Sequence, residues 1–537
     1  MIAVRYVSSR SATFELGGEG VFFAPAPFDV RIEGKIRQER VTTNVFSVFG
    51  LSPETTYSLE AGEDHITFRT RPETAFLDVR DFGAAGDGTT EDPSALQTAI
   101  LSCPAGGVVF LPAGTFRSKP LFLKSGVTVY VSEAATLLGE TDRNRYPVLP
   151  ASDETGEPLG SWEGEPQPIF ASLITGIGVE NAAVIGPGTI DGNAENGDWW
   201  QHPREAVGGA FRPRGIFLTH CRNIVLQGFT FRNSPSWNLH PFRSEGIDVL
   251  SLRIESPKDS PNTDGCDPES CDGVRILGVD ISVGDDCIAL KSGRYGPGCP
   301  NLVPCQNVTI RNCRMAFGHG GVVLGSESSG GIRDLSVSRC LFHETDRGLR
   351  IKTRRGRGRF GVIDGVTFED IRMEGVLTPF VINMFYFCDP DGKTEYVWSK
   401  SPLPVDDRTP VLGRFTFRDI VCTDAHVAAG FFYGLPESPI AGITLENVSV
   451  RFAREAVPSV PAMMSFLDPM ARKGFLFHNV GSVSVRNVRL EGVEGEAFVR
   501  EGVGSFEKAK KHWFLLEKSD IMSVHRLYRK TMARSGF

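Results

Sequence analysis

The sequence predicts an all-β protein whose larger part is a parallel β-helix, preceded by a small β-sandwich. Strand-like segments with alternating apolar residues recur at intervals of roughly 25 to 50 residues from about residue 223 onward, which indicates a stacked repeat. At 537 residues the chain exceeds one ordinary compact domain, whereas a repeat can lengthen coil by coil. Its 59 glycines and 37 phenylalanines suit short apolar strands joined by tight turns.

Residues 1–72 are expected to form the sandwich as a separate module. Strand-like runs with period-two alternation occupy residues 12–16, 28–32 and 41–45, and residues 66–70 would form the closing strand. Residues 51–57 end in Tyr57 and resemble the tyrosine corner of a fibronectin type III domain. We expect the module to act as a spacer or docking surface; the alternative is that it shapes one end of a binding cleft.

The solenoid is expected to span residues 73–505 and to begin with a helical cap. After a short linker at residues 71–74, a helical stretch places Leu96, Ala99 and Ile100 on one face. The first coil of a parallel β-helix exposes strand edges and core to water. An amphipathic helix at this point would close that end.

Each repeat unit consists of a short alternating strand, a bend residue and a second short strand. Clear copies start at residues 223, 274, 307, 362, 415, 443 and 483. The bend is asparagine or aspartate in five places: Asn312, Asp370, Asp419, Asn447 and Asn487. These residue types tolerate the left-handed backbone region and could hydrogen-bond along the solenoid. Neighbouring coils would lie about 4.8 Å apart, so residues one coil apart in sequence become neighbours in space.

Composition and cysteine usage favour an enzyme of a reducing compartment. The net charge of −8 gives no overall attraction for polyanions, so an acidic ligand would need a local cluster of positive charge. No apolar run is long enough to span a bilayer, and no secretory signal is visible. The eleven cysteines follow no disulfide or zinc spacing and are expected to be buried free thiols. We expect a cytoplasmic location, or a secreted or periplasmic one if the chain is a mature form.

Residues 506–537 depart from the repeat and form a basic C-terminal tail. Lysines and arginines predominate there, with Trp513, Phe514 and Tyr528 interleaved. We expect a helix that covers the last coil. Disorder and contact with a polyanion are the alternatives.

Four short segments place charged and polar residues where a solenoid needs only turns. They are residues 262–264 (Asn-Thr-Asp), 284–286 (Gly-Asp-Asp), 318–320 (Gly-His-Gly) and 350–352 (Arg-Ile-Lys). The steps from Asp264 to Asp286, from there to His319 and on to Arg350 are 22, 33 and 31 residues, each about one coil plus a loop. A single aspartate near a turn is usually a solvated loop residue. The ordered set of four instead favours a catalytic site on one face of the solenoid.

The three aspartates suit the hydrolysis of a glycosidic bond. That reaction needs a carboxylic acid to protonate the leaving oxygen and a carboxylate to activate water, and a separation of about 6.5–9.5 Å gives inversion. Asp285 and Asp286 are consecutive, so their side chains would diverge on an extended strand unless a bend turns both outward. Asp264 would add a third carboxylate from the neighbouring coil. Crowding is expected to raise the pKa of at least one of them, as a general acid requires.

This ordered set of motifs resembles glycoside hydrolase family 28, the polygalacturonases, over about residues 76–500. The resemblance implies a right-handed parallel β-helix of the pectin lyase-like type. It also implies hydrolysis of α-1,4-galacturonosidic bonds in pectin, a cell-wall polysaccharide. By the same resemblance Asp285 is the general acid, Asp264 and Asp286 hold the water as base, and His319 supports the protonation state of the acid.

The resemblance also assigns the groups that bind substrate. Arg350 would clamp the galacturonate carboxylate with two hydrogen bonds, and Lys352 would add a point charge. Tyr386 resembles the family's subsite tyrosine, and Asn262 is assigned to substrate binding with it. Neither a metal nor a cofactor is implied.

Residues 350–359 hold six positive charges and no acid, and they are expected to form the local basic patch that an acidic substrate needs. The arginines do not alternate with aromatic residues, as they would in a single-stranded nucleic-acid site. We therefore expect neither nucleic acid nor membrane as a partner.

Several features resemble the exo-acting bacterial branch of the family. They are the segments 262–271 and 320–327 and the fibronectin-like module. His319 argues for galacturonate on both sides of the bond, because the family's rhamnogalacturonan hydrolases generally lack it. Long insertions at residues 141–168 and 387–413 could wall off one end of the cleft.

Two rival functions stay open on the sequence. A pectate lyase also uses acidic residues on a β-helix, but it binds Ca²⁺ and eliminates instead of hydrolysing. A non-catalytic polysaccharide-binding solenoid is the other. The sequence leaves the oligomeric state and the product, galacturonate or digalacturonate, undecided.

Overall fold

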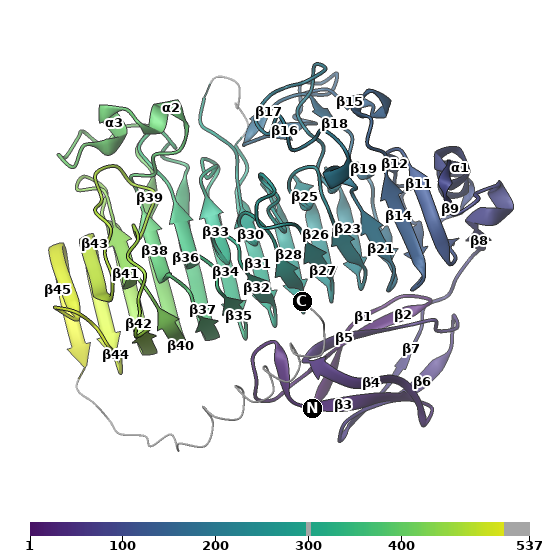
Figure 1. The fold of residues 1–537 in the computed structure, drawn as a ribbon, viewed down its shortest axis with the longest axis horizontal. Coiled ribbons are helices and arrows are strands. Elements are labelled where there is room, and N and C mark those ends of the chain that lie inside the picture. Colours follow the sequence, from purple (N-terminus) through teal and green to yellow (C-terminus); the bar gives the residue numbers. More distant parts are fainter. Residues whose placement is uncertain (297–301, 510–537) are drawn as a thin grey trace.

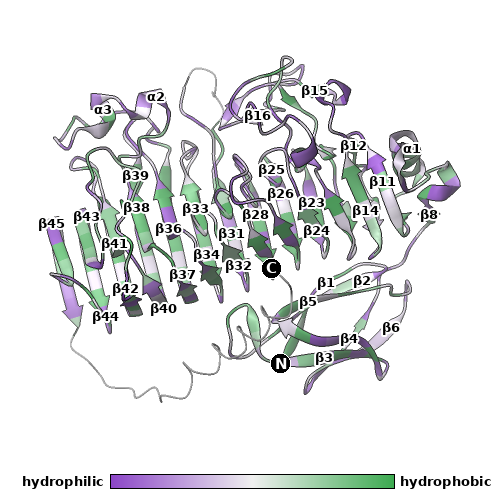
Figure 2. Cartoon of the chain, in the orientation of Figure 1, coloured by the Kyte–Doolittle hydropathy of each residue, from purple (hydrophilic) through white to green (hydrophobic). Residues whose placement is uncertain are grey.

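The computed structural model describes residues 1–296 and 302–509. Within them the chain is mostly β-structure, in a long solenoid with a small sandwich against its side (Figure 1). Apolar residues concentrate on the strands, whereas α2 at the periphery is largely hydrophilic (Figure 2). None of the described helices is long and apolar enough to cross a membrane.

The sandwich consists of two antiparallel sheets. One has the order β1-β2-β5 and the other β4-β3-β6-β7. The strands are β1 (Ile2–Val7), β2 (Ser11–Leu16), β3 (Phe23–Ile32), β4 (Lys35–Thr43), β5 (Val45–Phe49), β6 (Thr56–Ala61) and β7 (Asp64–Arg69). Phe14 and Phe46 stack in the core between the sheets. The Tyr57 hydroxyl accepts a hydrogen bond from the backbone N–H of Ser52 at 2.9 Å, which is the contact of a tyrosine corner.

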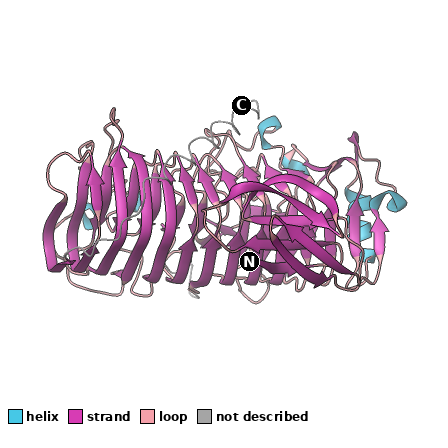
Figure 3. Cartoon of the chain, turned by 90° about the horizontal axis from the view of Figure 1, so that it is seen from below, coloured by secondary structure: helices cyan, strands magenta, loops and turns pink. Residues whose placement is uncertain are grey.

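Polar side chains dock the sandwich onto the solenoid. Glu15, which is 2% exposed, accepts hydrogen bonds from Arg311 at 2.6 Å and from Asn312 at 2.7 Å. Gln227 of the solenoid donates to Thr13 at 2.7 Å. Figure 3 shows the sandwich lying across the solenoid strands. The insertions stand on the opposite side of the solenoid from the sandwich in Figure 1, so the sandwich is docked away from them.

The strands of the solenoid pair in parallel to form three stacks along its length, which meet to enclose one core. Alternate residues point inward, as Val274 and Ile276 of β28 do. The first stack, against which the sandwich docks, contains β8 (Phe76–Asp78), β10 (Val108–Leu111), β13 (Thr128–Val131), β20 (Ala183–Ile185), β23 (Arg222–Gln227), β26 (Glu245–Leu250), β28 (Asp272–Leu277), β31 (Cys305–Arg311), β34 (Ile332–Ser338), β37 (Val362–Glu374), β39 (Val411–Leu412), β40 (Arg414–Ala425) and β42 (Ile440–Phe452).

The second stack follows the bend after each strand of the first. It contains β9 (Asp87–Glu91), β11 (Gly114–Ser118), β14 (Ala135–Gly139), β21 (Thr189–Asp191), β24 (Thr230–Arg232), β27 (Arg253–Glu255), β29 (Asp280–Ser282), β32 (Arg314–Ala316), β35 (Leu341–His343) and β44 (Arg489–Glu491). The long strands β37, β40 and β42 continue around the bend and belong to both stacks.

The third stack carries the polar segments that the sequence singled out. Its strands are β12 (Leu121–Phe122), β19 (Ile174–Ile177), β22 (Ile216–Thr219), β25 (Leu239–Phe242), β30 (Ile288–Leu290), β33 (Val322–Gly325), β36 (Arg347–Lys352), β38 (Thr378–Asn383) and β41 (Ala428–Tyr433). β43 (Lys473–Arg486) and β45 (Phe498–Ala509) run from the third stack into the first.

The bend residues form the ladder that the sequence predicted. Asn312, Asp370, Asp419, Asn447 and Asn487 all have φ between 50° and 55°, in the left-handed region. Asn487 donates to Asn447 at 2.9 Å, and Asn447 donates to Asp419 at 2.7 Å. The left-handed backbone is therefore confirmed at all five positions, and the bonding from coil to coil is confirmed at Asp419, Asn447 and Asn487. Asn312 donates to Glu15 of the sandwich instead.

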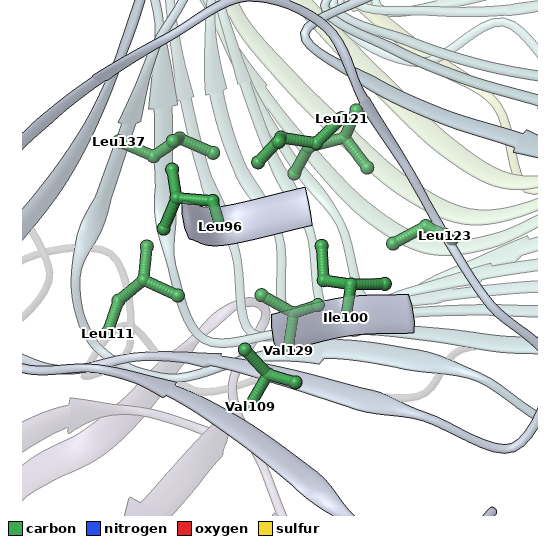
Figure 4. Close-up of a pocket in the computed structure, with 9 residues that line it drawn as sticks. Leu96, Ile100, Val109, Leu111, Leu121, Leu123, Val129 and Leu137 are labelled. Carbon is green, nitrogen blue, oxygen red and sulfur yellow. The ribbon is translucent and has the colours of Figure 1, made fainter. Parts of the chain in front are cut away.

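The helical cap is also confirmed. Helix α1 (Pro93–Ser102) turns Leu96, Ala99 and Ile100 inward, and all three are buried. Figure 4 shows Leu96 and Ile100 among the side chains that line the end of the core, such as Leu111 and Val129. The solenoid thus begins near residue 76, far before the repeat became visible in the sequence. Its early strands are short and are separated by an insertion.

The remaining elements lie in the loops. They are η1 (Val79–Phe82), η2 (Arg143–Arg145), η3 (Ala194–Asn196), β15 (Val148–Leu149), β16 (Ser161–Trp162), β17 (Glu165–Pro166), β18 (Ile169–Phe170), α2 (Asp389–Gly392) and α3 (Glu395–Trp398). β45 runs to Ala509, four residues beyond the solenoid boundary expected at 505. The rest of the predicted helical tail lies outside the described residues. Ten cysteines are described, all as free thiols and nine of them buried, as expected.

Candidate active site

Backbone hydrogen bonds bring the four polar segments together, one from each successive coil. The N–H of Gly265 donates to the carbonyl of Asp286 at 3.0 Å, and the N–H of His319 donates to that of Asp285 at 3.2 Å. The next rung joins Asp346, just before β36, to Gly318 at 3.0 Å. The expectation that all four segments line one face is confirmed.

Three carboxylates meet at this face. Asp264, Asp285 and Asp286 each offer an oxygen within 4.8 Å of the others. A bend at residues 284–285 turns both consecutive aspartates to the same side, and the Asp286 N–H donates to Asp285 Oδ1 at 3.0 Å. Asp264 and Asp286 are buried, whereas Asp285 is partly exposed. The spacing is shorter than the separation of about 6.5–9.5 Å expected for an inverting pair.

Asp286 is held by the two cations that were expected to bind substrate. Its Oδ1 accepts from Arg350 at 3.0 Å, and its Oδ2 accepts from Lys352 at 2.6 Å. Burial alone would raise the pKa of Asp286, but Lys352 and Arg350 outweigh burial and hold that pKa below its usual range. Asp286 is therefore a carboxylate in the free protein. Arg350 and Lys352 face it instead of standing free for a ligand.

One carboxyl group of the cluster, that of Asp264, has a raised pKa. Burial raises the pKa of Asp264 well above its usual range, and the charges of Asp267 and Asp285 raise it further. The crowding expected from the sequence is thus present, but the pKa that it raises is that of Asp264. Carboxyl groups this close share protons, so the proton of Asp264 is within reach of Asp285.

His319 stands beside the cluster, and its surroundings favour its charged form. Its Nδ1 and Asp346 Oδ2 are hydrogen-bonded at 2.9 Å. This bond raises the pKa of His319 against the effect of burial, and the nearby Asp285 and Asp286 raise it further. The sequence did not identify Asp346 as the partner of His319. Its only sign there is its position four residues before Arg350.

Tyr386 lies next to the cationic pair. Its ring is 5.6 Å from Lys352 Nζ, and the residue is 6% exposed. Met464, from the loop between β42 and β43, pairs with Tyr386, and the neighbouring Met463 accepts a hydrogen bond from Arg350 at its Sδ. Tyr386 therefore lies beside the cations expected to bind substrate, and its role in a subsite stays a prediction.

Asn262 has a positioning role in the structure. Its φ of 56° lies in the left-handed region, and its Oδ1 accepts from Arg212 at 2.7 Å. The buried Arg212 guanidinium also holds the carbonyls of Pro235 and Pro261. Asn262 therefore fixes the turn that leads to Asp264, and substrate binding by its side chain stays a prediction.

A buried charged chain behind the aspartates was not foreseen. Lys291, directly after β30, donates to Glu327 at 3.2 Å and lies 3.9 Å from Asp267. Neither oxygen of Asp267 has a hydrogen-bond partner among the described residues. Glu327 lies 3.6 Å from Arg294. The sequence offers one sign of this charged chain: Asp267, Lys291 and Glu327 each follow a polar segment by a few residues.

The basic patch expected at residues 350–359 is wrong. Arg354 and Arg355 are each 1% exposed and Arg357 is 4% exposed. Arg354 forms ion pairs with Asp389 and Asp391 of α2, and Arg355 pairs with Glu437. These arginines tie the loops to the solenoid, because a guanidinium can bond several carbonyls and carboxylates at once.

Comparisons with known proteins indicate one family. The sequence profile of glycosyl hydrolases family 28 matches residues 110–457. A probable polygalacturonase of Vitis vinifera is 31% identical over 70% of this chain and 74% of its own length. An endo-polygalacturonase of Pectobacterium parmentieri is 28% identical over 55% of this chain and 72% of its own. An exo-poly-alpha-D-galacturonosidase of Dickeya chrysanthemi is 26% identical over 67% of this chain and 64% of its own.

The fold has a solved counterpart as well. The family 28 exopolygalacturonase of Yersinia enterocolitica superposes with a TM-score of 0.70 at 19% identity, covering 95% of this chain and 98% of that one. The likeness shows the same fold. With profile, relatives and fold in agreement, the chain belongs to glycosyl hydrolases family 28.

Proposed function

We propose that this chain hydrolyses α-1,4-galacturonosidic bonds of polygalacturonate from a chain end and with inversion. The observation that carries the proposal is the cluster of three carboxylates within 4.8 Å, of which two cations hold Asp286 ionised. Hydrolysis needs one acid and one base, and burial and charge push the pKa values of Asp264 and Asp286 in opposite directions. The similarity to proteins named polygalacturonases supports the substrate.

In this proposal Asp285 takes up the proton that it shares with Asp264 and donates it to the leaving glycosidic oxygen. It is the partly exposed member of the cluster and can meet the bond, whereas Asp264 and Asp286 are buried behind it. Water held by the Asp286 and Asp264 carboxylates attacks the anomeric carbon as the carbon–oxygen bond breaks, and it gives its proton to Asp286. His319, whose charged form the hydrogen bond with Asp346 favours, lies beside Asp285 and stabilises the carboxylate left after transfer.

Inversion is proposed because Asp286 is a poor nucleophile. Both of its oxygens are occupied, by Arg350 and by Lys352. The short spacing of the carboxylates would otherwise suit retention. NMR of the first product from an α-linked substrate should show the β-anomer before mutarotation. If the α-anomer comes first, an aspartate attacks the sugar and the proposed roles of the three aspartates fail.

Arg350 and Lys352 bring two positive charges against one carboxylate, that of Asp286. The surplus charge suits the carboxylate of a galacturonate ring, whose oxygens would share the two donors with Asp286. This proposal differs from the expectation of free substrate clamps, because the same cations also keep the base ionised.

Exo action is proposed because ion pairs of Arg294 join the insertion at residues 141–168 to the insertion at residues 387–413. Arg294, after β30, lies 3.4 Å from Glu163 in the turn between β16 and β17, and 3.1 Å from Asp389 of α2. Both insertions rise from the same side of the solenoid (Figure 1). Glu327 and Lys291 link Arg294 to the buried charges behind the aspartates. Two insertions held together by these ion pairs would block one end of the binding site, as an enzyme that accepts only chain ends requires.

The product profile on polygalacturonate tests both the activity and the exo proposal. We expect galacturonate or digalacturonate alone at early times, with a slow fall in viscosity. A ladder of longer oligomers with a rapid fall in viscosity would show endo action instead. No release of reducing ends would refute the hydrolase. The substitution Arg294→Ala should loosen the wall and let longer products appear.

We propose further that the sandwich is a fibronectin type III-like domain covering residues 1–72. The sheet orders β1-β2-β5 and β4-β3-β6-β7 and the Tyr57 contact with Ser52 support this. For the solenoid, residues 73–505, we propose right-handed winding, which parallel crossovers strongly favour. A crystal structure would test both.

A cytoplasmic location is proposed from thiol chemistry. All ten described cysteines are free, as is usual in a reducing compartment. Fractionation of the source cells tests it, and enzyme found outside the cytoplasm would refute it.

A further inference from the structure

An aromatic pair, one ring exposed and the other partly buried, stands close to the active site and takes no part in the proposed bond cleavage. Phe466, in the loop between β42 and β43, is 81% exposed and has a φ of 64°. Its ring meets the ring of Trp398 in α3 nearly edge-on, with centroids 5.4 Å apart. A bulky residue is disfavoured in the left-handed region, and an exposed ring buries little apolar surface. Stability therefore does not account for a phenylalanine at this position, and a backbone outlier of this kind points to function.

The contacts of the same loop place the pair beside the substrate groups. Met463 accepts a hydrogen bond from Arg350, and Met464 pairs with Tyr386. Phe466 is two residues beyond Met464, a reach of at most about 7 Å along the chain. Trp398 belongs to the insertion that follows Tyr386 directly, where α2 and α3 stand together above the solenoid (Figure 1).

The chemistry of the pair suits one kind of ligand. A galacturonate ring has a face of C–H groups and an edge of hydroxyls and a carboxylate. Aromatic rings take the apolar face, as sugar and drug-sized ligands generally find apolar walls with a few polar groups. Arg350 contacts Met463, which is three residues before Phe466 in the same loop. The cations Arg350 and Lys352 are therefore placed to bind the charged edge of a neighbouring ring.

We propose that Phe466 and Trp398 form an outer subsite that stacks on a uronic acid ring away from the bond being cleaved. The proposal rests on the proposed hydrolysis of polygalacturonate and adds a binding site to it. The subsite acts on long substrates, whose distant rings reach it. It leaves the chemistry at Asp264, Asp285 and Asp286 unchanged.

Phe466→Gly tests this subsite, because glycine adopts a φ of 64° without strain. We expect KM on polygalacturonate to rise about three- to tenfold, which corresponds to the usual free-energy contribution of an aromatic contact. For the shortest oligogalacturonate that the enzyme cleaves, KM should not change, and neither should kcat on either substrate. Phe466→Trp should keep the wild-type KM. Val457→Ala, at a 60% exposed position of the same loop, is the matched control.

Thermal unfolding separates this role from a structural one. With the strain removed, Phe466→Gly should unfold at the same temperature as the wild type or higher. An unchanged KM on polygalacturonate, an equal rise on both substrates, or a fall in Tm that accounts for the loss would overturn the subsite. Failure of the proposed function is distinguishable, since the wild type itself would then be inactive on polygalacturonate.

Discussion

Replacing Lys352 with methionine should damage both the base and substrate binding, in ways that pH separates. Lys352 Nζ lies 2.6 Å from Asp286 Oδ2, and both side chains are at most 10% exposed. The charge of Lys352 is the main influence that lowers the pKa of Asp286 against burial. A charge-assisted hydrogen bond contributes about 1.5–3 kcal/mol, so its loss should reduce kcat/KM roughly ten- to a hundredfold.

The sign of the pH effect follows from the role of Asp286. Asp286 acts as a carboxylate, so activity is lost as the pH falls through its pKa. Without Lys352 that pKa rises, and the acid limb of the kcat/KM profile should move to higher pH. This movement should be the same on polygalacturonate and on methyl-esterified oligomers, because the pKa of Asp286 is a property of the enzyme and not of the substrate.

The loss on the alkaline side of that limb should depend on the substrate. A carboxylate bound by Lys352 is absent from methyl esters, so the loss there should be smaller. The assay is initial rates from about pH 3 to 8 on both substrates, a range that includes the ordinary carboxyl pKa of about 4. Lys35→Met, at an exposed lysine of the sandwich, is the control. An acid limb that stays in place would refute the pairing, and equal losses on both substrates would show that the substrate carboxylate is bound elsewhere.

Other contacts lead to three further predictions. Asp285→Asn should lower kcat by several orders of magnitude with KM little changed, since the acid is lost and the binding groups stay; near-normal turnover in a folded variant would refute its role. Glu15→Ala removes the shared partner of Arg311 and Asn312 and should lower the free energy of unfolding by about 1–3 kcal/mol, with kcat intact, as thermal melts and kinetics would show. EDTA should leave the activity unchanged, with no unsaturated product absorbing in the ultraviolet; inhibition by chelation would favour a calcium-dependent lyase.

Much of the fold could be predicted because a solenoid repeats local rules. The alternation of apolar residues and the bend residues from Asn312 to Asn487 depend only on neighbouring sequence and the next coil. The capping helix with Leu96 and Ile100 was predictable for the same reason. The first coils were not, because their strands are as short as Leu121–Phe122 and the insertion at residues 141–168 hides the period.

The sequence by itself determined which residues meet at the active site, since motifs about one coil apart must stack. Only the tertiary structure decided how their charges are distributed. Lys352 and Asp286 are 66 residues apart in sequence, and their pairing depends on side-chain reach across coils. The run of arginines was predicted to be an exposed patch, but in the structure Asp391 and Glu437, from distant loops, form ion pairs with it. Loop contacts such as that of Met463 with Arg350 follow no period, because they depend on loop length and packing in three dimensions.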